Sequence, residues 1–134
     1  MTVFVDTSGI FAVLDADDRY HGEADHLWRQ LVLETEQLLC TNYVLIESFA
    51  LVQRRLGMHA ARSLEEDILP LVRAHWAEEP DHRSAMAAFL TAGRRDLSLV
   101  DCVSFVIMRR LDVKLAFAFD QDFQDQGFEP YVGA

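Results

Sequence analysis

Two hydrophobic patterns alternate along the chain: short apolar runs, and longer stretches in which apolar residues recur every three or four positions. The short runs predict strands at residues 2–5, 37–41, 72–78 and 114–119, and an edge strand at 128–132, where a proline lacks a backbone donor. The longer stretches predict helices at 8–14, 21–34, 43–56, 59–69, 81–92 and 99–111. Alternating strands and helices are typical of an α/β fold with a parallel sheet.

Length and composition favour one globular domain. The chain has 134 residues, with no internal repeat and no linker rich in proline and glycine, so we expect residues 1–134 to form a single domain around one core. No apolar run approaches the ~18 residues of a membrane span. The first ten residues lack the basic segment of a signal peptide, so we expect a cytoplasmic protein with no membrane association. Cys40 and Cys102 lie in apolar stretches and are expected to be reduced core residues.

The charge balance limits how the chain could bind nucleic acid. It has 22 acidic residues against 12 lysines and arginines, a formal net charge of −10. Such a protein is not expected to bind a polyanion through its overall field, so it would need locally grouped cations or bound metal ions. Each adjacent pair of arginines could grip a phosphate bidentately, or could lie at a solvated helix end where it favours the helix dipole. The pairs are Arg54 with Arg55, Arg94 with Arg95, and Arg109 with Arg110.

Four acidic residues stand in apolar surroundings where a carboxylate is not expected. Asp6 follows the predicted strand TVFV, and Asp120 follows KLAFAF. Glu47 lies within YVLIESFALV and Asp101 within LSLVDCVSFVI, both predicted helices. An isolated carboxylate in such surroundings costs several kcal/mol or becomes protonated. A bound divalent cation is the simplest explanation that all four could share.

The predicted sheet could bring these acids together. Ligands of open α/β sheets bind at the carboxyl ends of strands, and Asp6 and Asp120 would share that edge if their strands are parallel neighbours. Asp101 and Glu47 both fall near the start of a predicted helix. Ligands that are all oxygen favour Mg²⁺ or Mn²⁺ over Zn²⁺. The chemistry that follows is metal-assisted hydrolysis of a phosphodiester, with the metal offsetting the acidity of the pocket.

Each of the four acids also has a purely structural interpretation. A carboxylate can cap a helix, begin a turn or pair with an arginine on a helix surface. The structural alternatives are a helix N-cap at Asp6, a capping box of Ser98 and Asp101, the first acid of a turn at Asp120, and an ion pair of Glu47 with Arg54 or Arg55.

Four segments of the sequence resemble those of a known family. They are VDTSGIFAVLD, NYVLIESFALVQRRLG, LSLVDCVSFVIMRRL and AFAFDQDFQDQGF, and together they span nearly the whole chain. In this order and spacing they resemble PIN-domain proteins, especially the VapC-type toxin ribonucleases of toxin–antitoxin pairs. The first and third segments are the more specific. The resemblance implies a three-layer α/β/α sandwich with a mainly parallel central sheet and an acidic metal pocket.

The resemblance also implies an activity and a set of roles. The expected activity is endoribonuclease cleavage of RNA with Mg²⁺ or Mn²⁺, and the expected partners are an antitoxin protein and a second copy of the chain. Catalytic and metal-binding roles are implied for Asp6, Asp101, Glu47 and Asp120. Supporting roles are implied for Thr7 and Ser8, whose hydroxyls could orient Asp6 or cap its helix, and for Asp122. Arg54, Arg55, Arg94 and Arg95 become candidates for RNA binding.

Other functions stay open at this point. A non-catalytic PIN fold could bind RNA or protein, a housekeeping nuclease could work without an antitoxin, and DNA could be the substrate. A phosphate-accepting receiver domain would need an acid adjacent to Asp6, where Thr7 stands. A dehalogenase-type phosphatase would need a second Asp at the position of Ser8. The sequence therefore favours a metal-dependent nuclease over these other acidic α/β enzymes.

Overall fold

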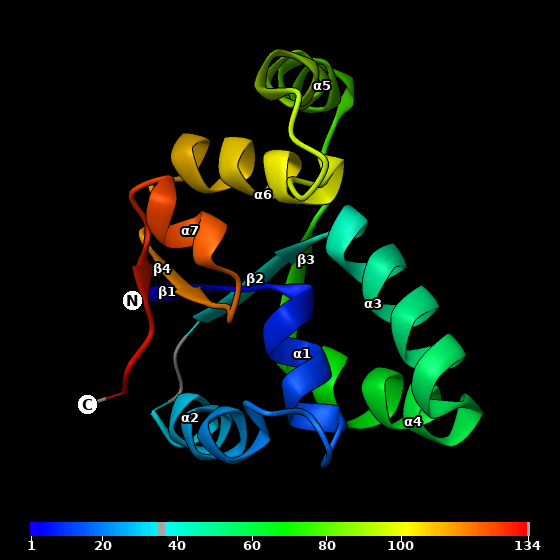
Figure 1. The fold of residues 1–134 in the computed structure, drawn as a ribbon. Coiled ribbons are helices and arrows are strands. Elements are labelled where there is room, and N and C mark those ends of the chain that lie inside the picture. Colours follow the sequence, from blue (N-terminus) through cyan, green and yellow to red (C-terminus); the bar gives the residue numbers. More distant parts are fainter. Residues whose placement is uncertain (35–36, 134) are drawn as a thin grey trace.

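The computed structural model describes residues 1–34 and 37–133. Its centre is a parallel sheet, in which the described strands follow the order β3-β2-β1-β4-β5 (Figure 1). The strands are β1 (Thr2–Val5), β2 (Gln37–Thr41), β3 (Val72–His75), β4 (Leu115–Phe117) and β5 (Glu129–Pro130). The prediction of an α/β fold with a mainly parallel sheet is confirmed, and β5 lies at an edge of the sheet as its proline requires.

Helices cover both faces of the sheet and make three layers. Figure 1 shows α5, α6 and α7 on one side of the sheet and α1, α2, α3 and α4 on the other. The helices are α1 (Thr7–Leu14), α2 (His21–Leu33), α3 (Asn42–Leu56), α4 (Met58–Ser63), α5 (Glu79–Ala92), α6 (Leu99–Arg110) and α7 (Gln121–Asp125). A π-helical turn (Leu64–Ile68) and a 3₁₀ turn (Leu69–Leu71) continue from α4 to β3.

The core explains why the strands read as continuous apolar runs. Helices cover β1 on both faces, so Val3, Phe4 and Val5 are all fully buried and none of them faces solvent. Ile10 of α1 and Ile107 of α6 are buried in the same hydrophobic cluster. Cys40 and Cys102 are free and buried, as the sequence predicts, so they contribute to packing and not to a disulfide.

The strand order reverses at β1, and this reversal creates a binding position. From β1 the chain adds β2 and β3 on one side of the sheet, and later adds β4 and β5 on the other. The carboxyl ends of β1 and β4 therefore meet at a switch point, where open α/β sheets bind ligands. The junction is tight, because the backbone N–H of Asp6 donates to the carbonyl of Phe117 at 3.1 Å.

Several predicted boundaries were wrong. The strand predicted at 72–78 ends at His75, because Glu78 and Asp81 form a capping box that starts α5 at Glu79, two residues before the predicted helix at 81–92. The strands predicted at 114–119 and 128–132 shorten to Leu115–Phe117 and Glu129–Pro130. The single helix predicted at 59–69 is divided into an α-helical, a π-helical and part of a 3₁₀ segment.

The sequence reading missed α7. This helix is too short to display a helical stripe, and its start is set by Asp120, whose side chain accepts from the backbone N–H of Asp122. Phe123 anchors it in the core, where its ring meets that of Phe105 edge-on at 5.0 Å between centroids. Within the described residues, no helix is both long and apolar enough to cross a membrane.

Candidate active site

Asp6 stands at the end of β1 and is held there by Ser8. The Asp6 carboxylate caps α1 by accepting from the Ser8 backbone N–H at 3.1 Å and from its hydroxyl at 2.7 Å. The same hydroxyl accepts from the backbone N–H of Phe119 at 2.9 Å, in the segment that follows β4. Ser8 therefore ties the carboxylate to the ends of both central strands.

Close approach of α1 to β4 depends on Gly9. A Cβ built at this position would lie 2.5 Å from the carbonyl oxygen of Phe117, closer than real Cβ contacts allow. Glycine thus allows the backbone of α1 to pack directly on β4. This contact sets the distance between the strand ends that carry Asp6 and Asp120.

Asp120 and Asp101 approach the same place from α7 and α6. Asp120 caps α7 by accepting from the backbone N–H of Asp122 at 2.9 Å. Asp101 lies in the first turn of α6, where its backbone N–H donates to the Ser98 hydroxyl at 3.0 Å. The Ser98 side chain therefore caps α6 through the backbone N–H of Asp101. Capping and a role for the Asp101 carboxylate in the pocket are compatible.

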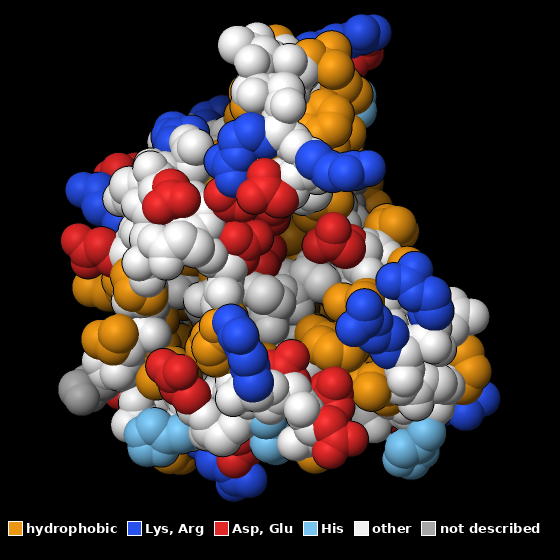
Figure 2. Space-filling model, in the orientation of Figure 1, with side chains coloured by type: hydrophobic (Ala, Val, Ile, Leu, Met, Phe, Trp, Pro, Cys, Tyr) orange, Lys and Arg blue, Asp and Glu red, His pale blue; other side chains and the backbone are white. Residues whose placement is uncertain are grey.

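A cavity of about 610 Å³ joins the four predicted carboxylates, since all four line it. Glu47 reaches it from α3, and the described residues show no ion pair between Glu47 and Arg54 or Arg55. The buried Ser48 hydroxyl donates to Thr7 at 3.2 Å and so holds α3 against α1. Figure 2 shows carboxylate side chains gathered in this part of the surface, with Lys and Arg side chains around them.

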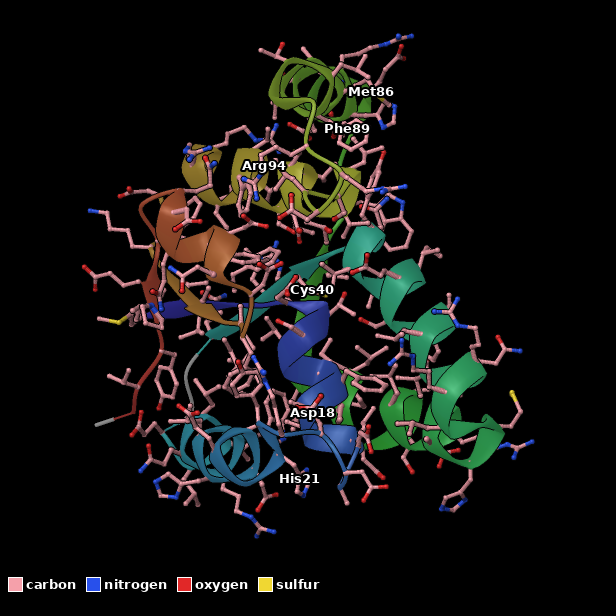
Figure 3. The ribbon with its side chains drawn as sticks, in the orientation of Figure 1. Asp18, His21, Cys40, Met86, Phe89 and Arg94 are labelled. Carbon is pink, nitrogen blue, oxygen red and sulfur yellow. The ribbon has the colours of Figure 1, made fainter. Side chains whose placement is uncertain are left out.

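Asp122 adds a fifth acid beside the cavity. Carboxylate oxygens of Asp101, Asp120 and Asp122 all lie within 4.8 Å of one another, a spacing that could hold a metal ion. Asp122 also accepts from Arg94 Nη2 at 3.0 Å, and the same nitrogen lies 3.1 Å from Asp96. Figure 3 shows Arg94 beside α6, above the site. The hydrogen bonds that Arg94 donates to Asp96 and Asp122 raise the pKa of its guanidinium, which stays charged.

The arginine pairs differ in their surroundings. Arg54 and Arg55 lie in the last turn of α3 and line the carboxylate cavity. Arg94 is engaged with acids, and Arg95 is exposed. The third pair has structural contacts: Arg109 donates to the carbonyl and the side chain of Gln126, and Arg110 pairs with buried Asp81 at 2.9 Å. Arg54 and Arg55 are thus the predicted cations best placed to meet a ligand in the cavity.

Three of the cavity's carboxyl groups, those of Asp6, Asp101 and Asp120, have raised pKa values. Burial raises the pKa of Asp6 to about 6, and hydrogen bonds from Ser8 offset part of this rise. Burial, followed by the charges of Asp6 and Asp120, raises the pKa of Asp101 to about 8. Burial also raises the pKa of Asp120. A bound cation would remove this penalty, because positive charge favours the ionised form of every carboxylate around it.

One unsatisfied oxygen supports a cation at this point. Asp6 Oδ1 is buried and has no hydrogen-bond partner, whereas Oδ2 has two from Ser8. A buried acceptor without a partner is rare and calls for an explanation such as an ion. The described residues that line the cavity offer carboxylate and hydroxyl oxygens but neither histidine nor cysteine. This donor set fits a hard divalent cation such as Mg²⁺ or Mn²⁺.

Sequence reasoning missed the aromatic side of the cavity. Tyr20 and Phe119 line it, and their rings stack with centroids 4.8 Å apart and planes 12° apart. Asp18 also lines it. Asp18 and Tyr20 lie outside every predicted helix and strand, whereas Phe119 is the last residue of a predicted strand. Their proximity arises only when the α1–α2 connection folds against the end of β4, so no local pattern could have revealed it.

Comparisons with known proteins give the following relatives. A model of the PIN domain family matches residues 3–129. The 23S rRNA-specific endonuclease VapC20 of Mycobacterium tuberculosis is 34% identical over 127 residues, which cover 94% of this chain and 95% of that protein. The crystal structure of M. tuberculosis VapC20, described as a sarcin–ricin loop cleaving toxin, superposes with a TM-score of 0.82 at 32% identity, over 94% and 95% of the two chains.

A more distant structure shares the fold. FitAcB from Neisseria gonorrhoeae superposes with a TM-score of 0.69 at 18% identity, over 98% of this chain and 96% of that one.

Proposed function

The chain belongs to the PIN domain family, and from this we propose that it is a metal-dependent endoribonuclease that hydrolyses RNA phosphodiester bonds. The observation that carries the proposal is the convergence of Asp6, Glu47, Asp101 and Asp120 on one cavity at the switch point of the sheet. The unpartnered Asp6 oxygen in that cavity supports a cation there. A relative with 34% identity over nearly its whole length is named as an endonuclease that acts on 23S rRNA.

The carboxylates would hold the cation and the chain's other residues would prepare them. Asp6, Asp101, Asp120 and Glu47 are the proposed ligands, with Mg²⁺ or Mn²⁺ as the ion. A divalent cation there would activate water and offset the charge of the phosphate. Ser8 fixes the Asp6 side chain through Oδ2 and so holds the orientation of the whole carboxylate, including the unpartnered Oδ1.

The arginines of α3 give this acidic protein a local surface for a polyanion. Arg54 and Arg55 line the cavity at the C-terminal end of α3, where we propose that they hold RNA phosphates beside the reacting one. Arg94 neutralises Asp122 and so lowers the negative charge that the phosphate must approach. This arrangement answers the problem of a net charge of −10, because it groups cations where the RNA phosphates would lie.

We propose an RNA substrate and a protein partner for this chain by analogy with M. tuberculosis VapC20. M. tuberculosis VapC20 is described as a toxin that cleaves the sarcin–ricin loop, so a structured ribosomal RNA loop is the first substrate to try. By the same reasoning we propose that the chain is the toxin of a toxin–antitoxin pair, controlled by an antitoxin protein. We further propose that it acts as a homodimer in the cytoplasm, as its resemblance to VapC-type toxins implies. A housekeeping nuclease without an antitoxin, or a binding module without activity, is the competing proposal.

Cleavage of a sarcin–ricin loop RNA tests the proposed activity. Wild-type protein should cut it with Mg²⁺ or Mn²⁺ and not with EDTA, and Asp6→Asn and Asp101→Asn should each abolish the cutting. Asp67→Asn is the matched control, because Asp67 is exposed and does not line the carboxylate cavity. Full activity in either site variant would contradict the proposed carboxylate centre. Folded wild-type protein that cuts neither this RNA nor a mixed RNA panel would favour the binding module.

A further inference from the structure

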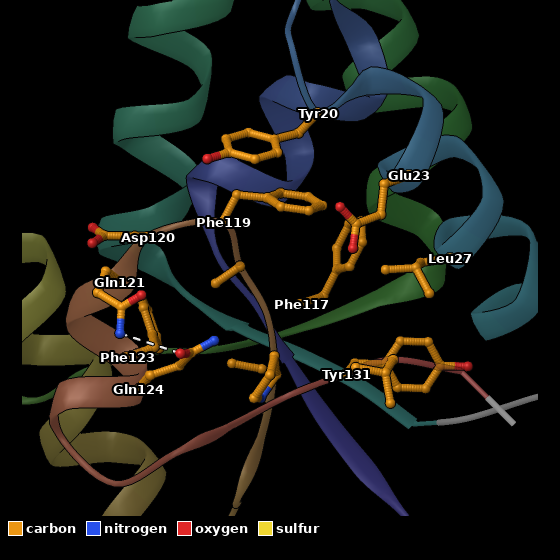
Figure 4. Close-up of a pocket in the computed structure, with 14 residues that line it drawn as sticks. Tyr20, Glu23, Leu27, Phe117, Phe119, Asp120, Gln121, Phe123, Gln124 and Tyr131 are labelled. Atoms are coloured by element: carbon orange, nitrogen blue, oxygen red, sulfur yellow. Dashed lines mark hydrogen bonds between the residues drawn. The ribbon is translucent and has the colours of Figure 1, made fainter.

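A second cavity opens beside the carboxylate site. Its volume is about 270 Å³, and it lies between α2, the end of β4, α7 and the segment after β5 (Figure 4). Tyr20, Phe119 and Asp120 line both cavities, so the two adjoin. None of the roles proposed for the carboxylates or the arginines uses this second space.

Aromatic rings line one side of the second cavity. Phe119 stacks on Tyr20, and its ring meets that of Phe117 edge-on, with centroids 5.8 Å apart. Figure 4 shows Phe117, Leu27 and Tyr131 on the side of the cavity away from Asp120. Flat apolar walls of this kind bind planar ring systems, and nucleobases stack on such side chains in single-stranded RNA complexes.

Polar groups stand at the rim of the same space. The Glu23 carboxylate is turned inward near Phe117 and Phe119 (Figure 4), and the described residues place no cation in an ion pair with it. On the opposite side, Gln121 Nε2 donates to Gln124 Oε1 at 3.2 Å. A small number of polar groups around an apolar cavity is the arrangement that orients a ligand and selects it.

Arg19 supplies a cation close by. Its guanidinium lies over the Tyr20 ring, 4.6 Å from the centroid, and donates to the Tyr20 hydroxyl. Stacked aromatic rings with an arginine and a neighbouring phosphate site are the parts of a surface that binds single-stranded RNA.

We propose that this second cavity binds one unpaired base of the RNA substrate, the base next to the phosphate that occupies the carboxylate site. The base stacks on Phe119, and Glu23 accepts hydrogen bonds from its Watson–Crick edge. Guanine suits this carboxylate best, because it displays two adjacent N–H donors there and uracil displays one. The volume lies just below the roughly 300–1,000 Å³ of pockets for drug-sized ligands, which suits a single base. The inference rests on the proposed ribonuclease function.

Binding of short RNAs tests the inference without requiring cleavage. The RNAs are fluorescent uridine hexamers with one guanosine, or one abasic site, at successive positions. Their affinities for the wild-type protein are measured by anisotropy with Ca²⁺, a hard cation that takes oxygen ligands as Mg²⁺ does. Guanosine at one position should bind about tenfold more tightly than uridine or an abasic site there. Adding Glu23→Gln should remove the preference for guanosine over uridine, since a hydrogen bond to a charged acceptor is worth about tenfold.

Two further variants complete the design. Glu66→Gln makes the same change of charge at an exposed position outside both cavities, and it should keep the guanosine preference. Gln124→Trp places a large ring at the mouth of the cavity. Because Gln124 is exposed, the substitution should not disturb the fold, and it should abolish the preference for guanosine over uridine.

The outcomes separate this inference from the proposed function. Equal binding of all hexamers, no binding of any of them, or a guanosine preference that survives both Glu23→Gln and Gln124→Trp would overturn the base-binding cavity, even if the wild type cuts RNA. A guanosine preference that depends on Glu23, in a protein whose wild type cuts no RNA, would support the cavity and refute the nuclease.

Discussion

Without metal ions, the wild-type protein should be less stable at pH 8 than at pH 5, and Asp101→Asn should remove most of this loss. The cause is the proton that buried Asp101 retains. Its pKa rises from the ordinary 3.8 to about 8, through burial first and then through the charges of Asp6 and Asp120. Because the folded protein holds this proton more tightly than the unfolded chain does, the contribution of Asp101 to stability is fully present below pH ~4 and is lost as pH rises from ~4 to ~8.

The magnitude follows from the same two pKa values. A carboxyl group with pKa 3.8 unfolded and about 8 folded lowers the free energy of unfolding by about 2 kcal/mol at pH 5 and about 5 kcal/mol at pH 8. The loss between these pH values is therefore about 3–4 kcal/mol. Asp6 adds its own loss between pH ~4 and ~6, where its raised pKa lies. The two losses overlap, because the charge of Asp6 is one cause of the pKa of Asp101.

Urea unfolding in EDTA at pH 5, 6.5 and 8 measures this effect. The difference in stability between Asp101→Asn and the wild type should grow by about 3–4 kcal/mol from pH 5 to pH 8. The exposed control Asp67→Asn should track the wild type at every pH. Mg²⁺ at a hundred times its dissociation constant should return about 2.7 kcal/mol to the wild type. A constant difference between Asp101→Asn and the wild type across this range would refute the account of buried, mutually repelling carboxylates.

Four further substitutions probe the site and its support. Ser8→Ala should reduce cleavage about 10- to 100-fold in a folded protein, as loss of a ligand's hydrogen-bond partner does; unchanged cleavage kinetics would contradict this role. Gly9→Ala should lower stability by about 1–3 kcal/mol, since its Cβ meets Phe117 oxygen at 2.5 Å; an unchanged urea midpoint would show that α1 can move away freely. The logarithm of the RNA-binding constant falls linearly with the logarithm of the salt concentration, and Arg54→Ala and Arg55→Ala should each reduce that slope by about one phosphate contact. An unaltered slope would show that these arginines do not contact RNA phosphates.

The sequence predicts the fold well because the strands are buried on both faces. Continuous apolar runs ending in an acid mark β1 and β4, and the reversal of strand order at β1 then brings Asp6 and Asp120 to one edge. Asp101 and Glu47 were identified because each interrupts an apolar helix. Their positions around the cavity match that reasoning, while the roles assigned to them stay predictions, as does the single-domain boundary.

What the sequence does not reveal depends on contacts between distant segments. The ion pair between Arg94 and Asp122 forms only when the α5–α6 connection meets α7, and α7 itself is too short to recognise by periodicity. The stack of Tyr20 on Phe119 likewise joins the α1–α2 connection to the end of β4. The second cavity depends on that stack, so no motif could have predicted it.

The link made by the Ser8 hydroxyl, between Asp6 and the backbone of Phe119, has a consequence for synthesis of the protein. A nascent chain that has not yet released β4 from the ribosome holds Asp6 without its neighbouring strand and lacks Asp120 altogether. Its carboxylate centre is therefore incomplete until residues as far as Asp120 have left the ribosome. A growing ribonuclease of this design cannot cut RNA before that point of its own synthesis.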